Sequence, residues 1–356
     1  MTVHDIETPR VETFGDRMMG ILNDSHLALM ISVGHRTGLF DALASVDWVT
    51  SDALAARTGL NERYVREWLG GMATGRIVEY RADTKSFCLP PEHATSLTRA
   101  AGADNLAPFM QYVSVLGSVE DDVVESFKHG GGVPYSRFPR FQEVMAEESG
   151  QSVLPALIDS VLPLVPGLPV ALERGIEVLD VGCGSGRALN LMARTYPASG
   201  FLGYDISDEG IGTGRREAAE AGLWNVAFSL QDAAQIRDEE RFDLITTFDA
   251  IHDQRDPVAV VQNIRRALRP GGVYLMQDIR SSVDLEKNID HPAGTLLYTI
   301  STMHCMTVSL AVDGEGYGAM WGEEKALELL HDAGFSNVEV HQLPHDFQNN
   351  WYVCRT

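Results

Sequence analysis

The sequence predicts an α/β fold, in which a doubly wound, mainly parallel sheet of seven strands follows an N-terminal domain that is all helical or winged helical. Two observations support this prediction. From residue 175 onward, short apolar runs with the length of strands alternate with amphipathic helical segments. Before residue 100 the pattern is mainly helical, with short segments separated by turn signals. The chain has 356 residues, of which 44% are hydrophobic, and this is enough for two cores.

Seven runs in the C-terminal half have the length and composition of strands. Helical segments separate the first five, as expected for parallel strands joined by crossover helices. The last two are joined by a loop instead of a helix, which predicts a hairpin at the edge of the sheet. The predicted strands are residues 175–179, 200–205, 226–230, 242–247, 272–276, 337–341 and 351–353.

The N-terminal part has helix-turn-helix spacing. Residues 51–60 read as a capped helix that ends in a glycine turn, and Asn61 caps the next helix. Strands at 75–80 and 86–89 would complete a winged helix. We expect a winged-helix dimerisation domain, a helical connector and lid, and an α/β domain with a substrate-side insertion, at residues 1–100, 101–172, 173–356 and 280–321, respectively.

The charge of the chain argues against nucleic acid and membranes as partners. The formal net charge of −22 repels phosphate backbones and anionic membrane surfaces. The helix that would read DNA offers Arg63 and Arg66 but also Glu62 and Glu67, so it has no basic face. We therefore expect the winged helix to serve dimerisation and not operator binding.

Cysteine usage and the N-terminus indicate a cytoplasmic protein. The four cysteines lie far apart and form no CxxC pair, as is typical of reduced thiols. The first residues lack the basic start and apolar core of a secretory signal. The longest apolar segment, residues 161–172, is short and contains three prolines, so we do not expect it to span a bilayer.

A GxGxG turn from Gly182 to Gly186 follows the first strand, and Asp180 precedes it. Glycines at the carboxyl end of a parallel strand let a ligand lie against bare backbone. Dinucleotide-binding turns space their glycines GxGxxG and face a pyrophosphate, beside which an acid is unfavourable. S-adenosylmethionine carries an ammonium and a sulfonium instead, so Asp180 favours this cofactor.

Two later carboxylates fit the same cofactor. Asp205 ends the second strand, where it can accept both ribose hydroxyls, and Asp232 follows the third strand, where it can accept the adenine amino hydrogen. The predicted cofactor-binding residues are Asp180, Gly182, Cys183, Gly184, Asp205, Ile206, Asp232, Ala233 and Phe248.

Four motifs in order resemble those of class I S-adenosylmethionine-dependent methyltransferases, which have a Rossmann-like sheet: residues 178–186, 204–207, 231–233 and 267–272. The N-terminal half resembles the small-molecule O-methyltransferases in which a winged helix dimerises and one subunit helps to close the pocket of the other. Residues 37–43 are similar to the entry motif of those enzymes. The strongest likeness is to a group of bacterial winged-helix methyltransferases, and it does not supply the acceptor.

The resemblance implies a catalytic base in the loop after the fourth strand. His252 and Asp253 stand there, and in the resembling enzymes a histidine–aspartate pair removes the proton of the acceptor hydroxyl. A structural, hydrogen-bonding role for His252 stays open, and Asp253 can equally cap a turn. His304 in the insertion is the alternative base.

The acceptor pocket is expected where the connector and the insertion meet the sheet. The predicted substrate contacts are Tyr112, Tyr135, His304 and Trp321, each of which can also be ordinary core. His252, His304 and Asp278 lack tight ligand spacing, so we expect no metal.

These observations predict a homodimeric methyltransferase that uses S-adenosylmethionine to modify a small, hydroxylated or aromatic metabolite, with O-methylation favoured over N- or C-methylation. The alternative is a regulator or degenerate methyltransferase that binds the cofactor without turnover and uses its winged helix to bind DNA or a partner.

Overall fold

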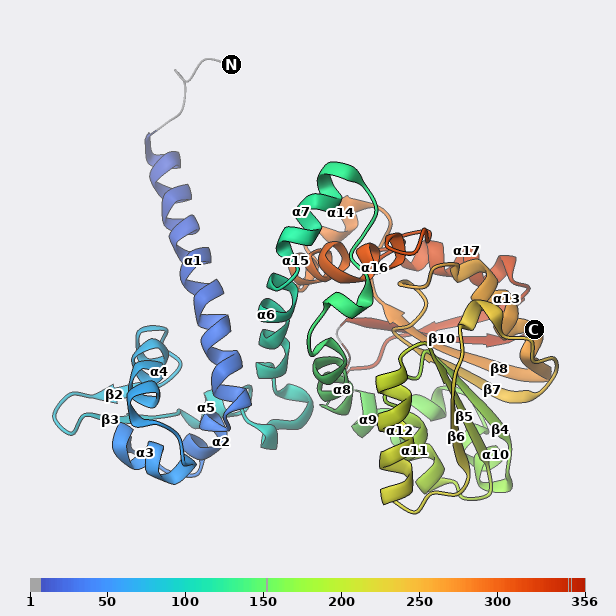
Figure 1. Cartoon of the computed structure of the whole chain (residues 1–356), viewed down its shortest axis with the longest axis horizontal. Helices are drawn as coiled ribbons and strands as arrows, with labels where there is room; N and C mark the ends of the chain where they lie inside the picture. Colours follow the sequence, from blue (N-terminus) through green and yellow to red (C-terminus); the bar gives the residue numbers. More distant parts are fainter. Residues whose placement is uncertain (1–7, 152, 345, 347, 356) are drawn as a thin grey trace. The chain divides into compact units, whose positions relative to one another are not determined.

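The computed structural model describes residues 8–151, 153–344, 346 and 348–355 (Figure 1). The chain divides into two compact units, Met1–Gly117 and Ser118–Thr356. Each unit has its own hydrophobic core, and each is described separately below.

The N-terminal unit is a winged helix preceded by one long helix, α1 (Thr8–Arg36), and by α2 (Leu39–Ala44). Helices α3 (Ser51–Thr58) and α4 (Glu62–Thr74) form the helix-turn-helix. Gly59, at φ 69°, ends α3, and the Asn61 side chain caps α4 by accepting from the Arg63 amide, as the sequence predicts. The core of this unit includes Leu54, Val65 and Trp68.

The wing is a small antiparallel sheet in the order β1-β3-β2, formed by β1 (Val49–Thr50), β2 (Glu79–Arg81) and β3 (Ser86–Cys88). The strand predicted at residues 75–80 corresponds to β2, which starts only at Glu79. Gly75 is the C-cap of α4, and Arg76 adopts a left-handed φ of 59°, so the backbone becomes extended only afterwards. The unit ends with α5 (Pro91–Ala94), the 3-10 turns η2 (Arg99–Asp104) and η3 (Ala107–Met110), and α6 (Gln111–Gly117).

The C-terminal unit begins with helices that lead to the large sheet. They are α7 (Glu120–His129), η4 (Tyr135–Arg137), α8 (Phe141–Gln151), α9 (Val153–Ala156), the π-helical turn η5 (Leu157–Val161), η6 (Leu162–Leu164) and α10 (Leu168–Arg174).

Within the described residues, no single helix has both the length and the apolar character to cross a membrane. One bent pair, Phe141–Leu164 with Leu168–Arg174, passes that test by length and composition alone. Side chains of this pair, such as Leu157 and Leu162, are fully buried in a core cluster that also includes sheet residues.

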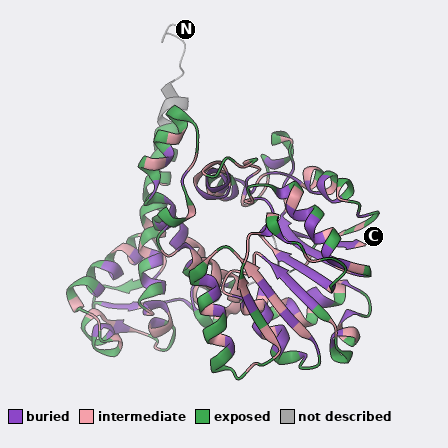
Figure 2. Cartoon of the chain, turned by 45° about the vertical axis from the view of Figure 1, so that its right-hand side comes forward, coloured by how far each residue is buried: buried purple, intermediate pink, exposed green. Residues whose placement is uncertain are grey.

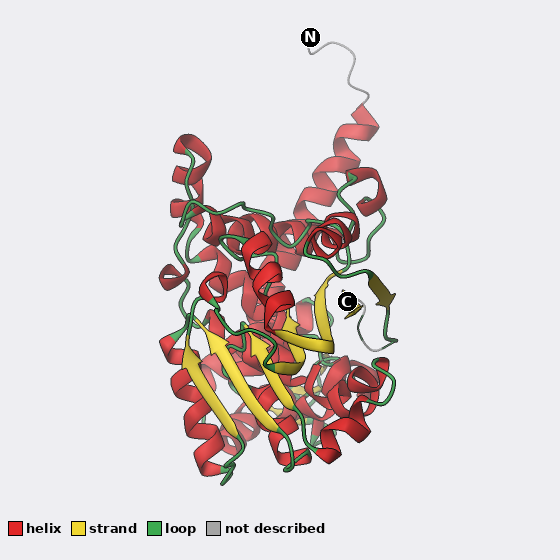
Figure 3. Cartoon of the chain, turned by 90° about the vertical axis from the view of Figure 1, so that its right-hand side faces the viewer, coloured by secondary structure: helices red, strands yellow, loops and turns green. Residues whose placement is uncertain are grey.

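The large sheet has seven strands in the order β6-β5-β4-β7-β8-β10-β9. Figure 3 shows strands of this sheet in yellow, with helices beside them in red. The five strands from β6 to β8 run parallel, and β10 pairs antiparallel with both β8 and β9, which confirms the predicted hairpin at the edge. The strands are β4 (Glu177–Val181), β5 (Gly200–Asp205), β6 (Val226–Leu230), β7 (Phe242–Phe248), β8 (Leu268–Ile279), β9 (Asn337–His341) and β10 (Asn349–Arg355).

Helices cover both faces of this sheet, and its strands are largely buried (Figure 2). Alternate residues of a strand enter two different cores. Val178 of β4 joins the cluster with α11 (Arg187–Thr195) and α12 (Asp208–Glu220), whereas its neighbour Leu179 joins the cluster with α13 (Pro257–Ala267) and α17 (Glu323–Asp332). Successive side chains of a strand point to opposite faces of the sheet. Because both faces of this sheet are covered, residues on both faces must be apolar, which explains the continuous apolar runs in the sequence.

The predicted insertion between β8 and α17 is helical. It contains α14 (Leu285–Asn288), α15 (Gly294–Ile300), the π-helical turn η8 (Ser301–Cys305) and α16 (Met306–Leu310). Such π-turns often occur at functional sites, and this one carries His304 and Cys305.

Candidate functional site

The glycine turn after β4 is shaped by left-handed backbone at all three glycines. Gly182, Gly184 and Gly186 have φ values of 74°, 53° and 65°. An added Cβ would lie 2.5 Å from the Ala250 Cβ at the first position and 2.1 Å from the Phe228 ring at the third. At Gly184 the nearest atom, Gln142 Oε1, would be 3.8 Å away, which is an ordinary van der Waals contact, so of the three glycines only the middle one has room for a further atom. A ligand can therefore approach the backbone at Gly184.

Asp205, at the end of β5, is held against this turn. One carboxylate oxygen accepts the Gly184 amide and the other accepts the Ser207 amide, each at 2.7 Å. Burial raises the pKa of Asp205, although these amide hydrogen bonds oppose the shift. Each oxygen keeps a second lone pair for a hydroxyl donor. Nearby, Ile206 and Leu230 expose apolar side chains at the ends of β5 and β6.

Asp180 lies beneath the turn and is only 2% exposed. Its Oδ1 accepts a hydrogen bond of 2.7 Å from the Thr246 hydroxyl. Burial raises the pKa of Asp180 to about 7, against the opposing effect of this hydrogen bond. The Cys183 thiol also has a raised pKa, first because it is buried and then because Asp180 and Asp205 are near. A cation at this turn would be stabilised by both carboxylates.

Asp232 follows β6 and caps the short 3-10 turn η7 (Ala233–Gln235). Its Oδ1 accepts the Ala234 amide and its Oδ2 accepts the Gln235 side-chain amide, each at 2.9 Å. Ala233 is buried, and its carbonyl accepts from Asn263. The contact of Asp232 with an adenine amino group stays a prediction.

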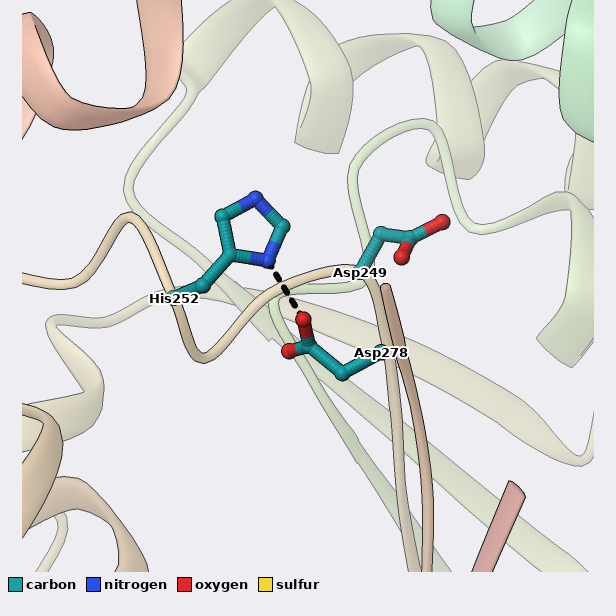
Figure 4. A group of neighbouring side chains, drawn as sticks. All are labelled: Asp249, His252 and Asp278. Carbon is teal, nitrogen blue, oxygen red and sulfur yellow. Dashed lines mark hydrogen bonds and ion pairs between the residues drawn. The ribbon is translucent and has the colours of Figure 1, made fainter. Parts of the chain in front are cut away.

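His252 forms a buried pair with Asp278 (Figure 4). The imidazole follows β7, the carboxylate is near the end of β8, and Nδ1 lies 2.7 Å from the Asp278 Oδ1. The same oxygen accepts the Ile279 amide at 2.8 Å and the Trp321 indole N–H at 2.9 Å. Burial alone would lower the pKa of His252, but the charge of Asp278 and the nearby Cys305 thiol outweigh it and raise this pKa. Besides Asp278, which engages Nδ1, the Cys305 thiol is a hydrogen-bonding neighbour of this imidazole.

This pairing corrects one expectation. We expected Asp253 as the acid that accompanies His252, but the carboxylate hydrogen-bonded to the imidazole belongs to Asp278. Burial, opposed by His252, raises the pKa of Asp253 to about 6. A catalytic part for Asp253 stays a prediction. The signal for Asp278 in the sequence was its place at the end of the fifth predicted strand.

Asp249 lies beside this pair in a left-handed conformation, with φ 50°. Its Oδ2 accepts from the Gln277 amide at 3.2 Å, and its buried Oδ1 has no hydrogen-bond partner among the described residues. Burial and then the charge of Asp278 raise the pKa of Asp249. Strained backbone and an unpaired buried oxygen are typical of functional sites.

Asp249, His252 and Asp278 place ligand atoms within 4.8 Å of one another, so by distance they could hold a metal ion (Figure 4). The hydrogen bonds favour another interpretation. Nδ1 of His252 already donates to Asp278 Oδ1, so a cation bound to this nitrogen would break that hydrogen bond, whereas Oδ2 of Asp278 and Oδ1 of Asp249 have no hydrogen-bond partner among the described residues. We interpret the group as a hydrogen-bonded support for His252, and the absence of a metal stays a prediction.

The other predicted residues lie in different surroundings. Tyr135 and His304 pack together, with ring centroids 5.1 Å apart. Trp321 is 4% exposed and belongs to the core behind Asp278. Phe248 ends β7 and contacts the Trp351 ring. Tyr112 is buried in the N-terminal unit, on α6. Contacts of these side chains with an acceptor or a cofactor stay predictions.

The raised pKa of Asp180 predicts how stability depends on pH. The group has a pKa of about 7 when folded but near 3.8 as a free side chain, so the folded state binds the proton more tightly. Its contribution is therefore fully present below about pH 4 and is lost as the pH rises through 7, by an amount of the order of 4 kcal/mol.

Urea unfolding of wild type and Asp180→Asn at pH 5 and pH 8 would measure this effect. We expect the free energy of unfolding of the variant to fall less between the two pH values. Asp208→Asn, at an exposed position, is the control and should behave as wild type. Equal pH dependence in all three proteins would contradict the assignment.

Comparison with known proteins agrees with this geometry. A family model described as an Rv2258c-like winged HTH domain matches residues 25–99, and a methyltransferase-domain model matches residues 172–334. A fatty-acid O-methyltransferase from Mycolicibacterium smegmatis is 32% identical over 111 residues, which are 31% of this chain and 40% of that protein. The chain thus spans less than half the length of the first curated relatives that it matches.

Two solved structures share the fold over nearly the whole chain. The mitomycin 7-O-methyltransferase MmcR superposes with a TM-score of 0.70 at 17% identity, covering 98% of this chain and 100% of that one. Human N-acetylserotonin methyltransferase, solved in complex with S-adenosylmethionine, superposes with a TM-score of 0.64 at 16% identity, covering 100% and 99%. The chain therefore has the fold of these two methyltransferases, with one region that matches a winged helix-turn-helix model and another that matches a methyltransferase-domain model.

Proposed function

We propose that this chain is an S-adenosylmethionine-dependent methyltransferase that methylates a hydroxyl group of a small, hydroxylated or aromatic metabolite. The observation that carries the proposal is the buried His252–Asp278 pair, which stands at the same edge of the sheet as the Gly184–Asp205 turn. The names of the matched relatives support methyl transfer to oxygen.

The residues around the turn fit the cofactor. Gly184 offers bare backbone, Asp205 has free lone pairs for ribose hydroxyls, and Asp180 places a carboxyl group where a cationic amino acid moiety would gain from it. Ile206 and Leu230 supply exposed apolar surface suited to a flat base. When bound, S-adenosylmethionine supplies an electrophilic methyl group.

His252 would act on the acceptor. Nδ1 is hydrogen-bonded to Asp278, so Nε2 is the nitrogen that can take the proton of the acceptor hydroxyl. Asp278 holds the ring in one orientation and stabilises the imidazolium that forms, in the manner of other histidine–aspartate pairs. Trp321 and the Ile279 amide fix Asp278 in turn.

We also propose a homodimer formed through the N-terminal unit, without nucleic acid as a partner. Helix α1 carries a series of exposed apolar side chains, which is a face suited to a second copy. Arg63 and Arg66 of α4 pair with Glu67 and Glu62, so this helix offers DNA little free positive charge. Measurement of the molecular mass by sedimentation tests the proposed dimer. A cytoplasmic location stays a prediction from the sequence. The exposed α1 residues are Phe14, Met18, Met19, Ile21, Leu22, Leu29 and Val33.

The transfer of labelled methyl groups from S-adenosylmethionine into a bacterial metabolite extract tests the proposed function. We expect label in at least one small molecule, with the label lost when His252 is replaced. Specific DNA binding at physiological salt, without label in any metabolite, would favour the regulator instead. Addition of EDTA should leave the rate unchanged, because the hydrogen bonds to Asp278 need no cation.

Two glycines of the turn give a matched pair of variants. Both have left-handed φ, so alanine costs about 1–2 kcal/mol in backbone strain at either position. Only at Gly186 would the new methyl also collide with the Phe228 ring. We expect Gly186→Ala to lower the melting temperature markedly. Gly184→Ala should fold nearly as well as wild type but bind S-adenosylmethionine at least tenfold more weakly, because its methyl enters the proposed cofactor surface.

Calorimetric titration and thermal melts of both variants check this prediction. Unchanged cofactor affinity in Gly184→Ala would exclude the turn as the binding surface. Equal melting temperatures of the two variants would contradict the steric argument for Gly186.

A further inference from the structure

His304 has a packing arrangement that the proposed proton transfer does not explain. Its imidazole is 2% exposed and stacks on Phe141, with ring centroids 3.6 Å apart and planes 8° from parallel. The rings of Tyr135 and Phe138 meet it edge-on, at 5.1 and 4.7 Å. Neither Nδ1 nor Nε2 has a hydrogen-bond partner among the residues that the structure describes. Buried polar atoms nearly always have partners, so two unpaired nitrogens in one ring require an explanation.

Ordinary core packing does not account for this histidine. A phenylalanine would make the same aromatic contacts without burying two unpaired polar atoms, each of which costs about 1–3 kcal/mol. Burial and the nearby His252 lower the pKa of His304 to about 3, which makes this imidazole a weak base. The ring is therefore neutral near pH 7, with one N–H donor and one nitrogen acceptor. Hydrogen bonding to another molecule is the chemistry that it can offer.

We propose that His304 is a specificity-determining residue that hydrogen-bonds a second oxygen of the methyl acceptor, and that this acceptor is an uncharged, planar aromatic molecule. The inference rests on the proposed function. His304 stands next to Cys305 in η8, and the Cys305 thiol hydrogen-bonds the His252 imidazole, so one small molecule can present its reacting hydroxyl to His252 and another oxygen to His304. Tyr135, Phe138 and Phe141 supply ring faces and edges that favour a flat aromatic partner.

The charge of the site decides against an anionic acceptor. Asp205 and Asp253 both act electrostatically on Tyr135, and Asp278 pairs with His252. These groups comprise three carboxyls, of Asp205, Asp253 and Asp278, and one histidine that can carry a positive charge, His252. An acceptor carboxylate would be repelled by these groups, whereas a phenol hydroxyl or a carbonyl oxygen would not.

Access to His304 requires movement of one short segment. Tyr135 and Phe138 both come from the chain between α7 and α8, where Gly130 and Gly131 have left-handed φ values of 74° and 79°. The Val133 amide donates to the Thr307 hydroxyl and anchors this segment to α16. Because both His304 nitrogens are buried, an acceptor oxygen reaches them only when these two aromatic rings shift.

Calorimetry with the full chain saturated with S-adenosylhomocysteine tests the proposal. The probes are phenol, its three dihydroxy analogues catechol, resorcinol and hydroquinone, and 3-hydroxybenzoate as an anion. At least one dihydroxy probe should bind wild type about tenfold or more tightly than phenol, and 3-hydroxybenzoate should bind more weakly than resorcinol. His304→Phe should remove the preference for the dihydroxy probe. No preference in wild type, no binding of any probe, or a preference retained in the variant would overturn the proposal.

Two controls separate recognition from structure. Met303 precedes His304 in the same turn, but its side chain lines an outer groove. Met303→Leu should therefore keep the wild-type preference for the dihydroxy probe. His304→Phe should melt at or above the wild-type temperature, since it removes two unpaired polar atoms. A much lower melting temperature would indicate a structural role and count against the proposal. His304→Asn, which keeps a donor and an acceptor, should retain part of the preference.

Wild-type measurements distinguish failure of this inference from failure of the proposed function. If the wild type neither binds S-adenosylhomocysteine nor transfers labelled methyl groups, the methyltransferase proposal fails. If it does both, and His304→Phe keeps the wild-type probe preference, only the role of His304 is wrong.

Discussion

Replacing His252 by alanine should lower turnover by roughly a hundredfold or more, the usual loss when a general base is removed. Affinity for S-adenosylmethionine should stay within about twofold of wild type, because in the proposed mechanism the imidazole acts on the acceptor and not on the cofactor at the glycine turn. Single-turnover transfer of labelled methyl, combined with calorimetric titration of the cofactor, measures the two effects separately. A parallel loss of cofactor affinity would instead indicate a structural role for His252.

His331→Ala is the matched control, since His331 is an exposed histidine in the last turn of α17 of the same unit, and it should keep full activity. Asp278→Asn tests the positioning role of the carboxylate. Asp278 raises the pKa of His252, so its removal should shift the acidic limb of the pH–rate profile to lower pH as well as lower the rate. A lower rate with an unshifted profile would argue that Asp278 supports only the fold.

Much of the fold could be predicted because local patterns determine it. The predicted bounds of β5, β6 and β9 match those of the structure, since these are apolar runs between clear turn signals. β8 starts four residues before the prediction, at Leu268. There it pairs with Phe242 ahead of a bulge, and Gly271 within this stretch reads as a turn in the sequence. Pairing with β7 therefore extends β8 through a segment that the local sequence predicts to be a turn.

The same distinction between local sequence patterns and long-range pairing applies to the candidate site. The glycine turn and Asp205 are close in the chain or follow consecutive strands, so sequence spacing was enough to bring them together. The partner of His252 was not predictable in this way. The β7–β8 register sets Phe248 opposite Gln277, which brings Asp278 to the loop that carries His252, and register is a property of the assembled sheet. Phe141, stacked on His304, lies even farther away in sequence.

Replacing Asp205 by alanine should weaken the binding of S-adenosylmethionine by roughly a hundredfold or more. The carboxylate is held by the Gly184 and Ser207 amides, so its remaining lone pairs are already oriented toward the turn. Two hydrogen bonds from ribose hydroxyls to a charged acceptor contribute about 1.5–3 kcal/mol each, and each 1.4 kcal/mol is a tenfold change in affinity. Calorimetric titration with S-adenosylmethionine and S-adenosylhomocysteine measures the loss.

Both ligands should lose affinity to a similar extent, because they share the ribose and differ at the sulfur. Asp208→Ala removes an exposed carboxylate three residues away, in the first turn of α12, and should bind both ligands like wild type. A loss confined to S-adenosylmethionine would mean that Asp205 acts through its charge on the sulfonium and not through the ribose. Unchanged affinity for both ligands would refute the ribose assignment, and the turn at Gly184 would then need another ligand.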